Sequence, residues 1–283
     1  MPEILLEARK LSFTYPGEDG ESPPALEGID LKVAAGEYVA LIGPNGSGKS
    51  TLLKLFNALL LPTAGEVFFD GRSTADARNI PYIRACCGMI FQNPDNQIVG
   101  ATVEEDVAFA LENQALPPPE IRRRVSEALE LLGISHLAAS PPHLLSGGEK
   151  QKVALAGVLA AASRCLLLDE PTAMLDPAGQ AAVLETLQML NRQRGITLVH
   201  VTHFPEEAAL AHRVLVLHGG RLVKEGPPAE VLADLPLLRA LGLKSTAAAE
   251  LAWLLREDGF PLPRGIVHNR ELVEQLCSYA RRI

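Results

Sequence analysis

The sequence lacks the long apolar runs and the leader pattern of chains that enter or cross a membrane. No stretch reaches the roughly 18 uninterrupted apolar residues of a membrane span, since the best candidate, VALAGVLAAASRCLLL, is broken by Ser163 and Arg164. The first ten residues, MPEILLEARK, carry early acidic residues and no long apolar core, so no signal peptide is expected. Any role at a membrane is therefore expected to come through a partner.

Cysteine is scarce, and its spacing is not typical of a metal site. The four cysteines are Cys86, Cys87, Cys165 and Cys277, and Cys165 begins an apolar strand-like run. We therefore expect a reduced, intracellular chain with buried thiols.

Basic residues are also fewer than acidic residues. Lys and Arg number 26 against 34 Asp and Glu, which gives a formal net charge of −8. An acidic balance is not typical of proteins that bind nucleic acid. The RRR run at 122–124 lies within an amphipathic pattern, where a solvated helix face explains it. We expect no nucleic-acid partner.

The chain does have enough apolar sequence for a large core. Hydrophobic residues make up 47% of its 283 residues, a length that favours one large domain with an appendage. Uninterrupted apolar strands that alternate with helical patterns are typical of a parallel sheet covered on both faces. Five such runs occur: YVALI (38–42), CGMIF (87–91), CLLL (165–168), TLVHV (197–201) and RVLVL (213–217).

Other segments predict antiparallel strands and an inserted helical part. ILLEARKLSFTY and LEGIDLKV look like half-buried antiparallel strands, and turns are expected at Asp70-Gly71 and Gly219-Gly220. In IRRRVSEALELLG the apolar residues share one helical face, and Gly133 is expected to end the helix. We expect an α/β fold with a main domain over 1–230, a helical subdomain at about 93–145 inserted into it, and a helical extension over 231–283.

Residues 43–51, GPNGSGKST, match the phosphate loop G-x-x-x-x-G-K-[ST]. Its glycines let backbone N–H groups wrap a phosphate chain, and the helical run LLKLFNALL that follows adds the positive end of a helix dipole. Lys49 is expected to reach the β- and γ-phosphates, and Ser50 to bind Mg²⁺. The predicted nucleotide ligands are Gly43, Pro44, Asn45, Gly46, Ser47, Gly48, Lys49, Ser50 and Thr51. A chance match is the alternative, which the flanking strand and helix disfavour.

Polar groups follow three further core strands: Gln92 after CGMIF, Asp169 and Glu170 after CLLL, and His203 after TLVHV. Ligands of open parallel sheets bind beyond the carboxyl ends of the strands. We expect Asp169 to hold Mg²⁺ and Glu170 to orient and partly deprotonate the attacking water. His203 is expected to contact the γ-phosphate, and Gln92 to contact Mg²⁺ or the water. A simple strand end for the acids and a satisfied core histidine are the plainer alternatives.

Tyr15, in FTYPG, is the candidate platform for adenine. A purine needs a flat surface on which to stack, and aromatic residues make up only 5% of the chain. Packing of Tyr15 in the core or in a turn is the alternative.

A second glycine-containing segment, LSGGEKQ at 145–151, precedes an apolar helical run and predicts another anion site at a helix N-terminus. Together with GPNGSGKST, Gln92, LLLDEPT, LD at 175–176 and His203, it resembles the ATP-binding-cassette (ABC) ATPases over residues 3 to about 230. In that family two cassettes pack head to tail, and the LSGGE of one closes over the nucleotide of the other. The resemblance therefore implies ATP contacts in trans from Ser146, Gly147, Gly148, Glu149 and Asp176.

FQNPDNQIVGATVEEDVAFALEN (91–113) and DEPTAMLDP further resemble the ATPase subunits of energy-coupling-factor (ECF) transporters, which import vitamins or transition-metal ions such as cobalt and nickel. This resemblance implies ATP and Mg²⁺ as cofactors and a second ABC ATPase chain, identical or related, as partner. It also implies a transmembrane coupling subunit, a substrate-binding membrane subunit, and a peripheral place on the cytoplasmic face of the cell membrane. The C-terminal extension is expected to add dimer contact.

Two other functional classes are alternatives. A soluble ABC ATPase of DNA repair is disfavoured, because repair members separate their motifs with long coiled coils, whereas Gln92 and Ser146 are 54 positions apart. Translation members carry two cassettes, but a role in cofactor assembly stays open. A regulatory cassette without turnover is disfavoured by the complete catalytic set. Lys152 and Phe204 stand where an arginine and an aspartate are frequent, although neither is a primary catalytic group.

Overall fold

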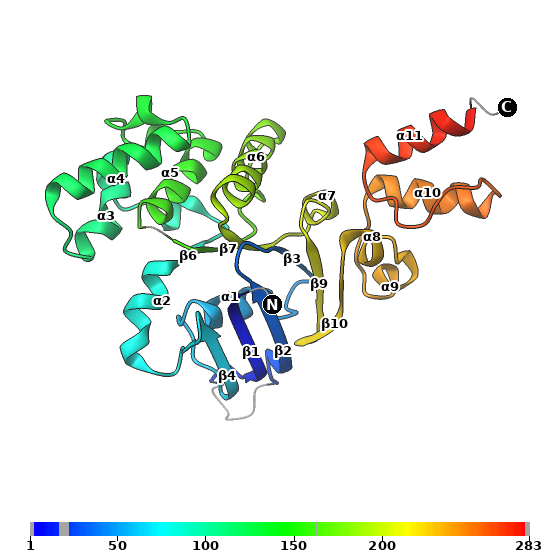
Figure 1. Ribbon diagram of the computed structural model, residues 1–283, viewed down its shortest axis with the longest axis horizontal. Coiled ribbons are helices and arrows are strands. Elements are labelled where there is room, and N and C mark those ends of the chain that lie inside the picture. Colours follow the sequence, from blue (N-terminus) through cyan, green and yellow to red (C-terminus); the bar gives the residue numbers. More distant parts are fainter. Residues whose placement is uncertain (1–2, 17–22, 162, 281–283) are drawn as a thin grey trace.

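The computed structural model describes residues 3–16, 23–161 and 163–280, and a six-stranded sheet forms its centre (Figure 1). The strand order is β10-β9-β3-β8-β7-β6, and neighbours are parallel except β9 and β10. The predicted parallel core and the turn at Gly219-Gly220 are confirmed. The strands are β3 (Tyr38–Ile42), β6 (Cys87–Ile90), β7 (Cys165–Asp169), β8 (Thr197–Val201), β9 (Arg213–His218) and β10 (Arg221–Gly226).

Both faces of this sheet are covered, which explains why its strands are apolar throughout. Successive side chains of a strand point to opposite faces. On one face, Ala40, Leu168 and Leu198 belong to the core beneath most of the helices. On the other, Leu41, Leu167 and Val199 belong to the core beneath the N-terminal sheet.

The N-terminal sheet is antiparallel, as predicted, with the order β2-β1-β4-β5. Its strands are β1 (Ile4–Phe13), β2 (Leu26–Ala34), β4 (Ala64–Phe69) and β5 (Arg72–Ser73). Helices α1 (Lys49–Phe56) and α2 (Ile80–Cys86) lie beside it, with a 3-10 turn at Ala77–Asn79. The predicted helix over LLKLFNALL was too long: α1 ends at Phe56, because Ala58 adopts a left-handed backbone with φ 55°.

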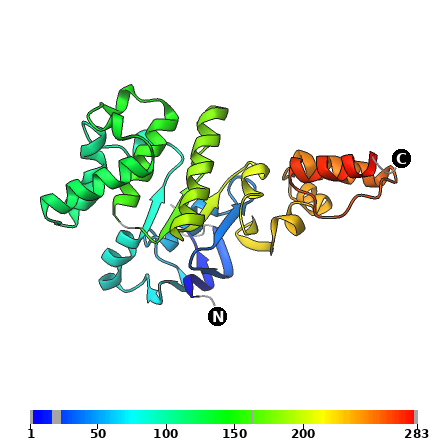
Figure 2. The ribbon, with the colours of Figure 1, turned by 45° about the horizontal axis from the view of Figure 1, so that its top comes forward.

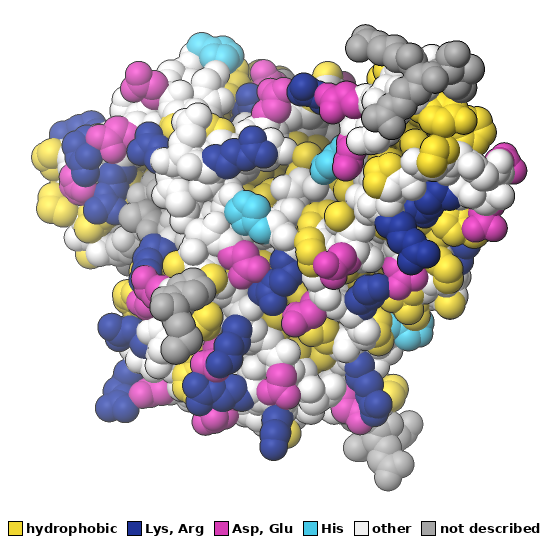
Figure 3. Space-filling model, turned by 45° about the vertical axis from the view of Figure 1, so that its right-hand side comes forward, with side chains coloured by type: hydrophobic (Ala, Val, Ile, Leu, Met, Phe, Trp, Pro, Cys, Tyr) yellow, Lys and Arg dark blue, Asp and Glu magenta, His cyan; other side chains and the backbone are white. Residues whose placement is uncertain are grey.

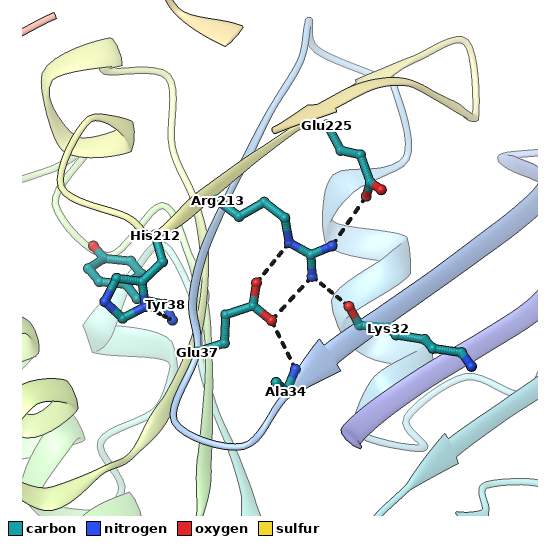
Figure 4. Close-up of polar contacts among 7 residues, drawn as sticks. All are labelled: Lys32, Ala34, Glu37, Tyr38, His212, Arg213 and Glu225. Carbon is teal, nitrogen blue, oxygen red and sulfur yellow. Dashed lines mark hydrogen bonds and ion pairs between the residues drawn. The ribbon is translucent and has the colours of Figure 1, made fainter. Parts of the chain in front are cut away.

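Arg213 joins the two sheets close to the start of β3 (Figure 4). Its guanidinium donates to the Glu37 carboxylate at 2.8 and 3.2 Å and to the backbone carbonyl of Lys32 at 2.5 Å. Glu37 also accepts from the backbone N–H of Ala34 at 2.9 Å. These contacts fix the turn between β2 and β3, and so the strand that leads into the phosphate loop.

Between β6 and β7 the chain is mainly helical. It forms α3 (Val103–Asn113), α4 (Pro118–Leu131) and α5 (Gly147–Ala160), with 3-10 turns at Pro94–Asn96, Ser135–Leu137 and Pro142–Leu144. As predicted, α4 buries Val125, Ala128 and Leu129, and Gly133 follows its end with φ 68°. Helix α5, which lies beyond residue 145, packs against both α3 and α4.

The C-terminal part begins in the main core and ends outside it. Helices α6 (Pro177–Arg194) and α7 (Pro205–Ala208) cover the sheet, and α8 (Pro228–Val231) and α9 (Leu235–Ala240) bring Val231, Leu235 and Leu238 into the same core. Helices α10 (Ala247–Glu257) and α11 (Asn269–Ala280) form a small core of their own. They lie at the opposite end of the molecule from α3, α4 and α5 (Figure 2).

Apolar side chains remain exposed on this C-terminal part. Leu251 and Leu254 on α10 and Val273 on α11 are about half exposed, and Figure 3 shows hydrophobic side chains gathered beside the C-terminal end. Within the described ranges, no helix combines the length and the apolar character needed to cross a bilayer.

Candidate functional site

The phosphate loop connects β3 to α1 and is packed tightly against neighbouring backbone. A Cβ atom at Gly43 would lie 2.1 Å from the carbonyl oxygen of Leu217, and one at Gly48 would lie 2.5 Å from that of Ala25. Gly48 also has φ 103°, which side-chain-bearing residues rarely adopt. Only glycine therefore fits at these two positions. The loop ends directly at the N-terminus of α1, where unpaired N–H groups favour an anion.

Lys49 lies inside this loop with only 6% of its surface exposed. Its ammonium group donates to the carbonyl oxygens of Gly43 at 2.8 Å and Pro44 at 3.0 Å. Burial lowers the pKa of Lys49, and the nearby carboxylates of Glu170 and Asp169 counteract that shift. Beside it, the buried hydroxyl of Ser47 has no hydrogen-bond partner among the described residues. A buried cation next to an unpaired hydroxyl fits a phosphate ligand.

Ser50 and Asp169 form an oxygen-rich pair where α1 meets the end of β7. The Ser50 hydroxyl donates to Asp169 Oδ1 at 2.9 Å. Burial raises the pKa of Asp169, and so does the charge of Glu170, while the bond from Ser50 lowers it. A bound cation would favour the ionised carboxylate. Hydroxyl and carboxylate oxygens are the donors that Mg²⁺ prefers, so the pair fits this ion.

Side chains from the ends of three strands, β6, β7 and β8, contact one another at Glu170. Its Oε1 lies 2.8 Å from His203 Nε2, and its Oε2 accepts from Gln92 Nε2 at 3.2 Å. Its backbone has φ 53°, an uncommon value for a residue with a side chain. This local turn separates Glu170 from Asp169, which contacts Ser50 instead. The structure thus brings together the acids, the amide and the imidazole that were predicted from separate segments.

Tyr15 lies beside the phosphate loop. A hydrogen bond of 3.0 Å joins its hydroxyl to that of Thr51, and its ring meets that of Phe13 edge to face with centroids 4.8 Å apart. The side chain is 42% exposed. It is anchored at one end and accessible along its ring, which suits a stacking surface.

The second anion segment occupies a different cavity. Ser146 caps α5: its hydroxyl accepts from the Glu149 N–H at 3.4 Å, and the Glu149 carboxylate accepts from the Ser146 N–H at 2.9 Å. The pKa of Glu149 is lowered chiefly by a bond of 2.7 Å from the Ser146 hydroxyl to its carboxylate, and further by the bond from the Ser146 N–H. A cavity of about 560 Å³ contains all five predicted in-trans residues, Ser146, Gly147, Gly148, Glu149 and Asp176. None of the phosphate-loop residues is among the described residues that line it.

A buried carboxylate behind the site, that of Glu207 on α7, was not predicted from the sequence. It accepts hydrogen bonds from the hydroxyls of Thr172 and Thr202, which flank the catalytic segments. In the sequence, only the position of Glu207 four residues after His203 could indicate a role at the site. The exposed Glu206 lies at least as near His203, so the sequence does not distinguish the two acids.

Comparisons with known proteins point to the same family as the motifs. The family model described as ABC transporter matches residues 26–173. The energy-coupling factor transporter ATP-binding protein EcfA1 of Symbiobacterium thermophilum is 52% identical over 283 residues, covering 99% of each chain. The EcfA1 of Caldanaerobacter subterraneus subsp. tengcongensis is 48% identical over 274 residues, covering 97% of this chain and 99% of the relative.

Solved structures show the same likeness. CbiO1 of Clostridium perfringens, part of the ABC transporter complex CbiONQ, has a TM-score of 0.76 at 38% identity, covering 90% of this chain and 99% of its own. A dimeric ATP-binding cassette, MJ0796 bound to ADP and Pi in a post-hydrolysis state, has a TM-score of 0.71 at 34% identity, covering 79% of this chain and 99% of its own.

Proposed function

The chain belongs to the ABC transporter family, and from that premise we propose that it is the ATP-binding and ATP-hydrolysing subunit of an energy-coupling-factor importer. It hydrolyses ATP, and membrane partners use the energy to take up vitamins or transition-metal ions such as cobalt or nickel. A soluble ABC ATPase of another pathway has less support, because relatives named as ECF ATP-binding proteins match nearly the whole chain.

One observation carries the ATPase assignment: the polar groups at three strand ends meet at Glu170. His203 and Gln92 both contact its carboxylate, and the neighbouring Asp169 contacts Ser50 of the phosphate loop. Four segments that are far apart in sequence thus supply one hydrolytic site.

In the proposed mechanism, the loop from Gly43 to Thr51 wraps the phosphates with backbone N–H groups, while Tyr15 stacks on the base. Lys49 binds the β- and γ-phosphates. Glu170 orients the attacking water and accepts part of its proton, and His203 stabilises the charge that develops on the γ-phosphate. Gln92 keeps the Glu170 carboxylate aligned.

Mg²⁺ is the ion that this donor set suits. Ser50 would bind it directly, Gln92 would contribute its amide oxygen, and Asp169 would hold it through the water that Mg²⁺ usually retains. When bound, the ion neutralises negative charge on the phosphates. The described residues offer no cluster of three or more His, Cys, Asp or Glu suited to a metal, which agrees with an ion held largely by substrate oxygens and water.

The proposed partner at this site is a second ABC ATPase chain, identical or related. Because Ser146 and Asp176 line a cavity away from the phosphate loop, we propose that they contact the nucleotide of the partner. The exposed apolar side chains of α10 and α11 support an additional dimer contact in the C-terminal extension.

The proposed location is the cytoplasmic face of the cell membrane, as a peripheral subunit. A transmembrane coupling subunit and a substrate-binding membrane subunit would complete the transporter. A tagged chain purified in mild detergent from its native membranes should therefore carry a second cassette and integral membrane proteins, detectable by mass spectrometry. Recovery from the soluble fraction with no membrane protein would contradict the importer, though not the ATPase.

The catalytic assignment is tested by Glu170→Gln, which keeps the shape of the side chain and removes its basicity. We expect ATP affinity to stay within about twofold of wild type while turnover falls at least about a hundredfold, since general-base catalysis contributes 10²–10⁴-fold. The matched control is Glu66→Gln at an exposed position on β4, which should hydrolyse ATP normally. A Glu170→Gln chain with near wild-type turnover would refute the role of Glu170.

A further inference from the structure

Glu207 is a charged side chain in an unusual place. It lies on the four-residue helix α7 with only 4% of its surface exposed. Acidic side chains are almost never fully buried unless they are paired. Here Oε1 accepts from the Thr172 hydroxyl at 2.7 Å and Oε2 from the Thr202 hydroxyl at 2.5 Å. His200 Nε2 lies 3.4 Å from Oε2.

The two threonines belong to the two segments that meet in the hydrolytic site. Thr202 directly precedes His203, and its oxygen also accepts from the Phe204 N–H at 3.0 Å, so the backbone is held on both sides of the histidine. Thr172 follows Glu170 by two residues. One carboxylate therefore links the segment that carries His203 to the segment that carries Glu170, through the hydroxyls of Thr202 and Thr172.

A purely structural role would not require a carboxylate. Burying an ionised group costs solvation that its hydrogen bonds and His200 must offset, and apolar packing of similar volume often stabilises a fold at least as well. What a carboxylate adds is two acceptor oxygens at a fixed separation. Such a group can set the distance between the two segments that carry His203 and Glu170, whose side chains lie 2.8 Å apart.

We propose that Glu207 is a positioning residue for ATP hydrolysis, holding His203 in contact with Glu170 by binding Thr172 and Thr202 together. The inference rests on the proposed ATPase function and deepens it. The side-chain contacts of Glu207 are with Thr172, Thr202 and His200, so its effect on hydrolysis is expected to pass through His203.

The first test measures hydrolysis by Glu207→Gln in two backgrounds. An amide has one acceptor oxygen where the carboxylate has two, so one of the two threonine hydroxyls loses the acceptor to which it now donates. In the wild-type background we expect kcat to fall roughly tenfold to a hundredfold, as for misplacement of a reacting group by about 1 Å, with ATP affinity unchanged. In the His203→Ala background, single-turnover hydrolysis should change less than about twofold on adding Glu207→Gln. An equal loss in both backgrounds would mean a structural role and overturn the proposal.

Thr202→Val and Thr202→Ser provide matched variants if Glu207→Gln fails to fold. Valine has the shape of threonine without the hydroxyl and should reproduce the loss, whereas serine keeps the hydroxyl and should stay near wild type. A loss of the same size in both variants, or in neither, would contradict the proposal.

The second test does not depend on turnover. In chain labelled at its seven histidines, the His203 ring signals, assigned with His203→Ala, report the contact of the ring with Glu170. We expect them to move in Glu207→Gln and in Thr202→Val but not in Thr202→Ser, and unchanged signals would overturn the inference. If the wild type hydrolyses no ATP, the proposed function fails, and this test still decides whether Glu207 positions the ring.

Discussion

Neighbouring residues can serve different partners when the backbone between them turns sharply, and Asp169 and Glu170 do so. Asp169 is the last residue of β7 and contacts Ser50, whereas Glu170 has a left-handed φ of 53° and contacts His203. Such a backbone costs on the order of 1–3 kcal/mol and persists where the surroundings enforce it. The Glu170 N–H bond to the Val201 carbonyl at 3.0 Å is one such restraint. The strained backbone directs the two neighbouring acids to different partners, Asp169 to Ser50 and Glu170 to His203.

The buried Glu207 predicts a specific response to acid. Burial opposes ionisation, but His200 and the hydroxyls of Thr172 and Thr202 outweigh it, so the pKa of Glu207 lies below its ordinary value of 4.5. A lowered acid pKa stabilises the fold above the unfolded pKa, and this stabilisation is lost as pH falls through the folded one. Melting temperatures of wild type and Glu207→Gln should therefore differ at pH 7 and converge below about pH 4.5. The exposed Glu66→Gln should follow wild type throughout, and a constant difference for Glu207→Gln would contradict the assignment.

At the scale of whole elements, the same capping motif begins two helices that differ in their proposed function. Helix α3 begins with a capping box of Thr102 and Glu105, and α5 begins with one of Ser146 and Glu149. In each, the hydroxyl accepts from the N–H three residues on, and the glutamate bonds back. The LSGGEKQ segment (145–151) therefore stabilises the start of α5 by itself. Its proposed ATP contact is added to that structural role.

Variants of the two capping boxes can distinguish the contribution of Ser146 to helix stability from its proposed contribution to ATP hydrolysis. Ser146→Ala and Thr102→Ala should each cost about 1 kcal/mol, which lowers the melting temperature by about 2–4 °C in a chain of this size. Only Ser146→Ala should also reduce ATP hydrolysis, because only Ser146 lies in the proposed in-trans cavity. Thermal unfolding and ATPase assays of both variants check this. Equal loss of activity in the two would indicate that helix stability alone matters.

Elements with local signals could be predicted from the sequence, and contacts between distant residues could not. The strand YVALI is apolar at every position, so a window of five residues is enough to identify it. The end of α1 depends on the left-handed backbone of Ala58. Alanine rarely adopts this conformation, so the sequence does not indicate it. Glu207 could not be found because its partner Thr172 is 35 positions away. The phosphate loop, the acids and His203 could be placed on one rim because parallel strands bring their carboxyl ends together.

Across the whole molecule, the main core continues past residue 230. Directly beyond that point, Val231, Leu232, Leu235 and Leu238 are buried with the central sheet, and farther along the chain Ala249 and Val267 also reach this core. A second, smaller core starts with Ala248 on α10. We propose that the ATPase domain extends to about residue 243, and that the extension proper follows.

Two truncations test this boundary. A chain ending at residue 230 loses four buried aliphatic side chains worth about 1.5–3 kcal/mol each. The sum of about 6–12 kcal/mol approaches the whole stability of a typical domain, about 5–15 kcal/mol, so this chain should aggregate. A chain ending at residue 243 keeps them and should unfold cooperatively. Soluble expression and thermal unfolding measure both, and a cooperatively folded 1–230 chain would place the boundary earlier.

The separation of the Ser146 cavity from the phosphate loop also has a genetic consequence. In a dimer of two copies of this chain with the proposed in-trans contacts, each copy would carry halves of two composite sites. When a copy defective at Lys49 pairs with a copy defective at Ser146, both defects fall in one site, and the other keeps two intact halves. Such alleles, each inactive alone, would complement one another, whereas alleles defective at Lys49 and at Glu170 would not. The two motifs of this single gene would therefore behave as separate complementation groups.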